Sequence, residues 1–219
     1  MSKICISGPA VSGKTYFIDN LNYFFTVTYP EAARKVSSMY PNLAVNDLTA
    51  FREKVCKFQI DVESLNLEND NNIHIFDRGI IDNLTFLFLQ NDENFNSELI
   101  RINRLYAGGI IKPYDYIFYF DISPFEKLTP LLTEALNDPL RKATINVENF
   151  NQHIIDFRNT FIDVVNFLGL SKKVVVETAY PDKAGYDERN EAVKEFIQLC
   201  WNNFSYEERL LYKYMDVSL

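Results

Sequence analysis

The sequence predicts an α/β fold in three layers, in which helices cover both faces of a five-stranded, mainly parallel sheet. Two observations predict this class. Short β-prone apolar runs alternate along the chain with longer segments of helical periodicity. The apolar runs are also nearly continuous in apolar character, which is typical of strands that are buried on both faces of a parallel sheet.

Five runs are expected to form the strands. Each is rich in β-branched or aromatic residues and is bounded by Gly, Pro, Asp or other polar residues. In chain order they are Lys3–Ser7, Phe24–Tyr29, Ile73–Phe76, Tyr116–Phe120 and Val174–Val176.

The intervals between these runs are expected to form helices. In Asp47–Leu67, for example, apolar residues recur at spacings of three and four and form one apolar stripe. Gly108-Gly109 and Gly169 follow two of the helical segments and are helix C-cap signals. The expected helices are Lys14–Tyr23, Asp47–Leu67, Ile80–Leu89, Ser97–Tyr106, Pro124–Leu136, Val147–Leu168, Glu188–Trp201 and Tyr206–Met215. Asn137–Asn146 is the best candidate for a mobile loop.

The composition fits a single folded domain over residues 1–219, because 47% of the residues are apolar. The formal net charge of -8 argues against a broad basic face for duplex nucleic acid or an anionic membrane. Three widely spaced cysteines predict reduced thiols, and neither histidine has a partner at metal-ligand spacing. With no signal peptide and no apolar stretch long enough to span a bilayer, we expect a cytoplasmic protein.

An eight-residue segment after the first strand matches the pattern GxxxxGK[ST]. Its residues are Gly8, Pro9, Ala10, Val11, Ser12, Gly13, Lys14 and Thr15. The glycines let consecutive backbone N–H groups point at phosphate oxygens, and the helix that follows adds donors and a favourable dipole. Lys14 can reach the β- and γ-phosphates, and the Thr15 hydroxyl can join a Mg²⁺ shell.

A chance turn is the alternative for this segment. Its place between an expected strand and an expected helix favours a phosphate-binding loop, the P-loop. We therefore expect a three-layer P-loop NTPase fold, with ATP and Mg²⁺ as the cofactors, and Thr15 and Asp77 as the residues that serve the metal.

Charged residues follow the second and third expected strands. Glu31 and Arg34 belong to the segment PEAAR, and Asp77 and Arg78 belong to FDRGIID. Because residues just past the carboxyl ends of parallel strands line the ligand crevice, both pairs should face the P-loop. Glu31 and Asp77 are candidates for taking the proton of an acceptor hydroxyl, and the two arginines are candidate phosphate-side cations.

Other roles are open for these residues. Glu31 and Arg34 could form an ion pair at spacing i,i+3 in the first turn of a helix. Asp77 could cap a helix beside a solvated Arg78, although it stands where an acid of the Walker B type binds Mg²⁺ through water. Asp82 could cap the same helix or pair with Arg78.

The three motifs in this order resemble the P-loop kinase-like ATPases that include the nicotinamide riboside kinase domain of bacterial NAD-regulator proteins. That family shows GxxxxGKT, P-E-x-x-R and F-D-R-G-x-x-D. The D-R-G segment is also similar to that of thymidylate kinases and to the acid-Arg-Ser segment of deoxynucleoside kinases. In those kinases the acid after the second strand contacts the acceptor hydroxyl, so the resemblance implies that role for Glu31. The resemblance covers the first 180 residues or so.

The resemblance also implies a helical lid, at approximately residues 123–170, that carries arginines over the phosphates. Arg141 and Lys142 lie at the matching place, and Arg158 is a further candidate. The family's lid usually reads Asp-Gly-x-Arg, whereas this sequence has Pro139 in place of the glycine. Arg141 and Lys142 could instead be solvated loop charges.

Phe51 and Arg52 lie on the long helix that would wall the acceptor site. Together with Glu31 and Arg34 they form the expected acceptor-binding set, since a nucleobase or pyridine ring could stack on an aromatic side chain. Most of the aromatic residues are nevertheless expected in the core.

We expect ATP-dependent phosphoryl transfer to a hydroxyl or phosphate of a nucleoside or nucleotide-like small molecule. One alternative is an NTPase that hydrolyses ATP in a regulatory role. The other is a viral-type kinase that acts on a modified base in DNA, against which the acidic net charge argues. C-terminal helices at approximately 187–216 would close the domain, and a homodimer contact by the last of them is left open.

Overall fold

The computed structural model describes residues 2–65, 72–123, 125, 127–137 and 149–203. Its sheet has five strands in the order β2-β3-β1-β4-β5, and every pairing is parallel. The strands are β1 (Ser2–Ser7), β2 (Thr26–Tyr29), β3 (Ile73–Asp77), β4 (Tyr116–Ile122) and β5 (Val174–Ala179). The predicted P-loop NTPase class, with a five-stranded parallel sheet, is confirmed.

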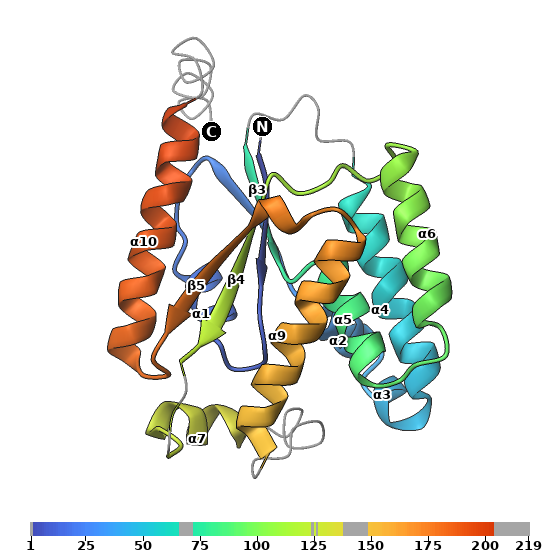
Figure 1. The fold of residues 1–219 in the computed structure, drawn as a ribbon, viewed down its shortest axis with the longest axis horizontal. Coiled ribbons are helices and arrows are strands. Elements are labelled where there is room, and N and C mark those ends of the chain that lie inside the picture. The colour runs from blue at the N-terminus through green and yellow to red at the C-terminus, as the bar shows by residue number, and fades with distance from the viewer. Residues whose placement is uncertain (1, 66–71, 124, 126, 138–148, 204–219) are drawn as a thin grey trace.

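The helices form layers on both faces of this sheet (Figure 1). They are α1 (Lys14–Asp19), α2 (Ala32–Met39), α3 (Leu43–Asn46), α4 (Leu48–Glu63), α5 (Ile80–Leu89), α6 (Phe95–Ala107), α7 (Pro130–Leu136), α9 (Phe150–Phe167) and α10 (Lys183–Asn202), with a short 3-10 turn, η2 (Ser171–Lys173). In Figure 1, α10 covers one side of the sheet and α9, α5, α4 and α6 lie on the other.

Alternation along the central strands divides the core into two clusters. Ile4 and Ile6 of β1 face α1 and α10 and pack with residues such as Trp201. Cys5, between them, faces the opposite layer and packs with residues such as Phe157 of α9. The central strands β1, β3 and β4 are buried on both faces, which explains why their sequences are almost continuously apolar, whereas the edge strands β2 and β5 are partly exposed.

The helix starts differ most from the predicted boundaries. α7 begins after Thr129, whose hydroxyl accepts a hydrogen bond from Leu132 N, and not at Pro124. α10 begins at Lys183, five residues before the predicted start, after Asp182, whose carboxylate accepts from Gly185 N at 2.8 Å. In both cases a capping side chain sets the start, as N-caps generally do.

The sequence analysis missed two short helices and misplaced the start of one strand. α2 and α3 were not predicted, because both are short and α2 buries only Ala32 and Val36. β2 begins at Thr26 and not at Phe24, since Phe25 stacks on the Trp201 ring with centroids 4.5 Å apart.

Several predicted features lie outside the described residues. These are the helix Tyr206–Met215 and all but the first residue of the loop Asn137–Asn146. The glycine signals are confirmed: Gly108 caps α6, and Gly169, with a φ of 69°, follows α9. The three cysteines are free, and burial raises the pKa of Cys56 to about 12. Over the described ranges, no helix combines the length and the apolarity that crossing a membrane requires.

Candidate functional site

The P-loop joins β1 to α1 at the carboxyl edge of the sheet. Gly8 and Gly13 take positive φ angles of 134° and 81°, and Val11 between them has a φ of 56°. A Cβ on residue 8 would lie only 2.4 Å from the Phe120 carbonyl oxygen of β4. Glycine is therefore required at position 8 both by the backbone conformation and by the close approach of β4. The predicted P-loop is confirmed as a strand–turn–helix connection.

Lys14 is the first residue of α1, and its side chain folds back over the loop. The ammonium donates to the Gly8 carbonyl at 2.9 Å, to the Pro9 carbonyl at 2.6 Å and to the Ser12 hydroxyl at 3.0 Å. Burial, together with the charge of Arg78, holds the pKa of Lys14 well below its usual value. Phosphate oxygens would stabilise the charged ammonium more strongly than carbonyl groups do, because such hydrogen bonds are charge-assisted.

Asp77 and Thr15 meet beside the loop. The Thr15 hydroxyl donates to Asp77 Oδ2 at 3.1 Å, while Asp77 Oδ1 is buried without a hydrogen-bond partner. Burial and the neighbouring charge of Glu31 raise the pKa of Asp77. An acceptor-only oxygen that is buried and unpartnered is suited to a cation or its bound water.

These two residues fit a Mg²⁺ ion of the kind that nucleotides carry. Among the described residues, no group of three His, Cys, Asp or Glu side chains could hold a metal ion alone. Mg²⁺ is commonly held by one or two protein oxygens, several waters and substrate phosphates. Thr15 and Asp77 would supply the protein ligands here, and the ion would neutralise phosphate charge during transfer.

Arg78 links the P-loop to the second strand. Its guanidinium Nη1 donates to the Gly8 carbonyl at 2.9 Å and pairs with Asp82 at 3.2 Å. Its Nε lies 3.0 Å from Glu31 Oε1. Burial works against the charge, but Glu31 and Asp82 outweigh it and raise the pKa of Arg78. The residue has a φ of 66°, a strained conformation for a side chain of this size.

Glu31 lies at the carboxyl end of β2, as the N-cap residue of α2. It is paired with Arg78 and also with Arg34, whose Nε is 3.1 Å from Glu31 Oε2. The i,i+3 pair considered for Glu31 and Arg34 therefore exists alongside the pair with Arg78. Burial alone would raise the pKa of Glu31, but Arg78, Lys14 and Arg34 hold it below its usual value.

The predicted residues at the ends of three strands are thus brought together. Asp82 both caps and pairs, as considered: it accepts from Gly79 N at 2.9 Å and pairs with Arg78. The Ser7 hydroxyl donates at 2.7 Å to Asp82 Oδ1, the oxygen that also pairs with Arg78, which fixes the acid against β1. With every one of these groups buried, the Asp77–Asp82 segment has little freedom to move.

A second buried network supports the same segment from behind. Glu63 of α4 pairs with Lys3 at 3.0 Å and accepts from Ile80 N at 2.8 Å and from the Tyr114 hydroxyl. Gln59 donates to Glu63 at 2.8 Å and reaches the Arg78 carbonyl at 3.5 Å. The backbone that carries Arg78 is therefore hydrogen-bonded to two side chains of α4.

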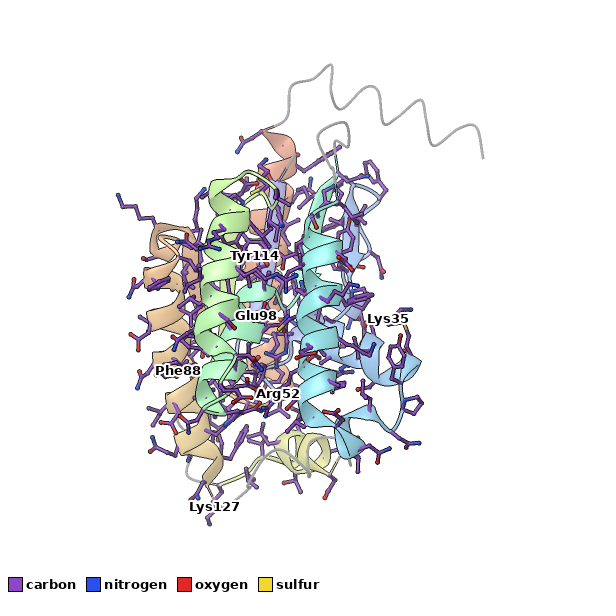
Figure 2. The ribbon with its side chains drawn as sticks, turned by 90° about the vertical axis from the view of Figure 1, so that its right-hand side faces the viewer. Lys35, Arg52, Phe88, Glu98, Tyr114 and Lys127 are labelled. Carbon is purple, nitrogen blue, oxygen red and sulfur yellow. The ribbon has the colours of Figure 1, made fainter. Side chains whose placement is uncertain are left out.

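The structure places Phe51 and Arg52 in other contacts. Phe51 packs on the small apolar cluster between α2 and α4. Arg52 pairs with Asp92, on the connection between α5 and α6, at 2.6 Å, and Figure 2 shows it low on α4 facing α6. Their assignment to acceptor binding remains a prediction. Arg141 and Lys142 lie outside the described residues.

Two features near the P-loop were missed by the sequence analysis. Asp121, close to the carboxyl end of β4, pairs with Arg158 of α9 at 2.5 Å, so the candidate lid cation is held by an acid. The strand-end rule that identified Asp77 would also have found Asp121. The Tyr186 hydroxyl of α10 donates to the Val11 carbonyl at 2.6 Å. No sequence signal marks this contact, which joins residues 175 positions apart.

Comparison with known proteins places this fold and site in a class. The sequence matches the family described as AAA domain over residues 3–163. Since the match covers well over half of the chain, the protein belongs to that family and has a nucleotide-binding P-loop domain. No curated protein matches the sequence.

Several solved structures share the fold. A NadR protein in complex with NR superposes with a TM-score of 0.63 at 16% identity, covering 93% of this chain. This chain spans about half, 51%, of the NadR chain. Deoxyadenosine kinase from M. mycoides with bound dATP gives a TM-score of 0.56 at 15% identity, over 88% of this chain and 99% of that one. At these identities the likeness shows the fold.

Proposed function

We propose that the protein transfers a phosphoryl group from ATP to a hydroxyl or phosphate of a nucleoside or nucleotide-like small molecule. The observation that carries this proposal is the separation of the two carboxylates around the P-loop. Asp77 is bonded to Thr15 on the side of the metal, whereas Glu31 is paired with Arg78 and Arg34. Binding of Mg²⁺ needs Asp77 but does not need Glu31. The second carboxylate therefore supports a further task at this site, which is contact with an acceptor.

The residues divide the work of such a transfer between them. The P-loop backbone and Lys14 bind the donor phosphates, and Thr15 and Asp77 serve the metal. Glu31, ionised because its pKa is lowered, orients the acceptor hydroxyl and accepts its proton. Arg78 touches both Glu31 and the Gly8 carbonyl, so it fixes the acceptor side relative to the donor side and adds positive charge where phosphate charge develops.

The solved neighbours support this class of substrate. The M. mycoides kinase structures hold dATP, dCTP or products such as dCMP, and the NadR structure holds NR. Those ligands are nucleosides and nucleotides, and the site described above occupies the same fold. We infer a cytoplasmic location and a single kinase-like domain with residues 123–170 as the lid, in which Arg141 would reach the donor phosphates.

Acceptor-independent ATP hydrolysis is the second candidate, because the AAA domain family match defines a nucleotide-binding domain and leaves the acceptor open. Hydrolysis needs a group that activates water. The acids near the loop within the described residues already have protein partners: Asp77 is bonded to Thr15, Glu31 and Asp82 pair with Arg78, and Asp121 pairs with Arg158.

A panel of acceptors with γ-labelled ATP tests the proposal. Purified protein is incubated with Mg²⁺, labelled ATP and, in separate reactions, nucleosides, nucleoside monophosphates, nicotinamide riboside and a DNA oligonucleotide. We expect label on a small-molecule acceptor, with little free phosphate when the acceptor is left out. Release of phosphate at the same rate with and without every acceptor would favour hydrolysis, and label on the oligonucleotide would favour the DNA-directed reaction.

A further inference from the structure

Arg189 is a buried arginine in the second turn of α10, on the face of the sheet opposite the acceptor residues. It is 3% exposed. Its guanidinium lies 3.9 Å from the centre of the Phe120 ring and 4.8 Å from that of the Tyr186 ring. The side chain is therefore stacked between two aromatic rings, one on β4 and one on its own helix.

The charge of Arg189 lacks the partners that a buried guanidinium usually has. Its Nη2 donates to Asn190 Oδ1 at 3.3 Å, whereas Nε and Nη1 are buried without a hydrogen-bond partner. Within the described ranges no carboxylate lies within ion-pair distance, and Glu177 attracts it only from further away. Burial lowers the pKa of Arg189 to about 10, so the group is still charged at neutral pH. A buried charge without a full set of partners is costly to the free protein.

Arg189 lies next to Gly13, on the side of the P-loop that faces α10. A Cβ on residue 13 would lie 2.9 Å from Arg189 Nη2 and 3.0 Å from Tyr186 Cδ2. Tyr186 itself holds the Val11 carbonyl. Gly13 is thus required both by its φ of 81° and by α10, which packs against the loop with one hydrogen bond and one positive charge.

We propose that Arg189 is a positioning residue of the phosphate site, whose positive charge behind Gly13 strengthens the binding of a diphosphate or triphosphate group in the P-loop. This inference rests on the phosphate site of the proposed function. A bound phosphate brings negative charge to the other side of Gly13, and the low-dielectric surroundings strengthen the attraction across the thin backbone. The same charge that is uncompensated in the free protein is compensated in the complex.

A packing role and a phosphate-binding role of Arg189 predict different effects on the stability of the free protein and on its affinity for phosphate. If Arg189 were only a packing residue, replacing it would destabilise the free protein and leave phosphate affinity nearly unchanged. If it acts on phosphate, a neutral replacement of similar length should leave the free protein as stable as before, or more stable, and weaken binding. A lysine loses the planar stack but can carry the same charge, which bound phosphate stabilises, so it should preserve most of the affinity.

Calorimetric titration with inorganic pyrophosphate and with MgADP, together with thermal unfolding of the free protein, tests this. The variants are Arg189→Met, Arg189→Lys and the control Arg101→Met, which removes an equal charge from an exposed arginine on α6. For Arg189→Met we expect pyrophosphate and MgADP to bind at least about tenfold more weakly, or about 1.4 kcal/mol. Arg189→Lys and Arg101→Met should stay within about threefold of the wild type.

Pyrophosphate binding by Arg189→Met within about twofold of the wild type would overturn the inference, and so would an equal loss in the lysine and methionine variants. Should Arg189→Met fail to fold, Arg189→Gln takes its place with the same expected loss, because it keeps a polar group next to Asn190. If the wild type binds pyrophosphate and MgADP and Arg189→Met binds them equally well, this inference fails but the proposed function stands. A wild-type protein that binds neither pyrophosphate nor MgADP would overturn the proposed function as well.

Discussion

Glu31 and Asp77 are two carboxylates of one site whose pKa values move in opposite directions. Arg78 and Arg34 lie against Glu31 and outweigh its burial, so its pKa falls. Asp77 has the Thr15 hydroxyl against one oxygen, and its burial, together with the charge of Glu31, raises its pKa. Environments that separate two acids in this way are typical of sites in which each acid has its own task.

The two acids should therefore fail differently when they are neutralised. Glu31→Gln keeps the size of the side chain but cannot accept a proton, so turnover should fall by about a hundredfold or more while ATP binding is preserved. Asp77→Asn should instead raise the Mg²⁺ concentration needed for half-maximal activity. Turnover measured against both Mg²⁺ and acceptor concentration distinguishes the two variants.

Glu98→Gln is the control, because Glu98 is a partly exposed acid on α6 that also pairs with an arginine, and it should leave both profiles unchanged. The assignment is reversed if Glu31→Gln turns over like the wild type while Asp77→Asn is inactive at saturating Mg²⁺. In that case Asp77 is the base and Glu31 only orients Arg78.

At the scale of an element, the start of α5 carries the site. The Gly79 backbone is wedged against the Tyr114 ring, and a Cβ there would lie 2.2 Å from the Tyr114 hydroxyl and 2.9 Å from Cys5 Sγ. Tyr114 in turn donates to Glu63, which holds Ile80 N. The D-R-G segment thus needs glycine for packing, since its φ of -128° is open to any residue.

Gly79→Ala should destabilise the protein, because neither Tyr114 nor the strand behind it can move without breaking the Glu63 network. Overpacking of this kind costs about 1–3 kcal/mol, and the shift of the neighbouring Arg78 should lower turnover as well. Urea unfolding measures the first effect and the acceptor assay the second. Gly108→Ala, at the C-cap of α6, is the control and should cost less, because its added Cβ approaches the Arg104 carbonyl at 3.1 Å and makes ordinary contact with Ile110 at 3.9 Å.

Strands and long helices were the elements that could be predicted from the sequence. Buried parallel strands such as β3 and β4 are almost wholly apolar, and α4 shows a clear apolar stripe. α2 and α3 were missed because they are short and bury few residues. The start of β2 was misplaced because Phe25 belongs to an aromatic contact with Trp201, 176 positions away.

In the candidate site, the sequence predicted the residues that local motifs specify. The GxxxxGK[ST] pattern and the strand-end rule located Lys14, Thr15, Glu31, Asp77 and Arg78, which the fold brings together. The contacts of Arg52 with Asp92 and of Tyr186 with Val11 join segments far apart in the chain. Such pairings depend on how helices pack, and no local pattern encodes them.

At the scale of the whole molecule, ligand binding should appear as stability. A ligand that only the folded state binds adds RT ln(1 + [L]/Kd), or about 2.7 kcal/mol at a hundredfold excess over Kd. MgATP should therefore raise the melting temperature, and ATP with a chelator should raise it less, because Asp77 and Thr15 then lack their metal. A melting temperature that saturating MgATP leaves unmoved would contradict the phosphate site.

The central claim is that the P-loop of this protein drives phosphoryl transfer to an acceptor, and Lys14→Ala tests it most directly. Lys14 is the one ionisable residue of the loop, and its side chain is buried against the loop backbone. With the acceptor that the panel identifies, transfer of label from γ-labelled ATP should fall by about three powers of ten or more. Circular dichroism should show that the variant is folded. A folded Lys14→Ala variant that labels the acceptor at close to the wild-type rate would contradict the account.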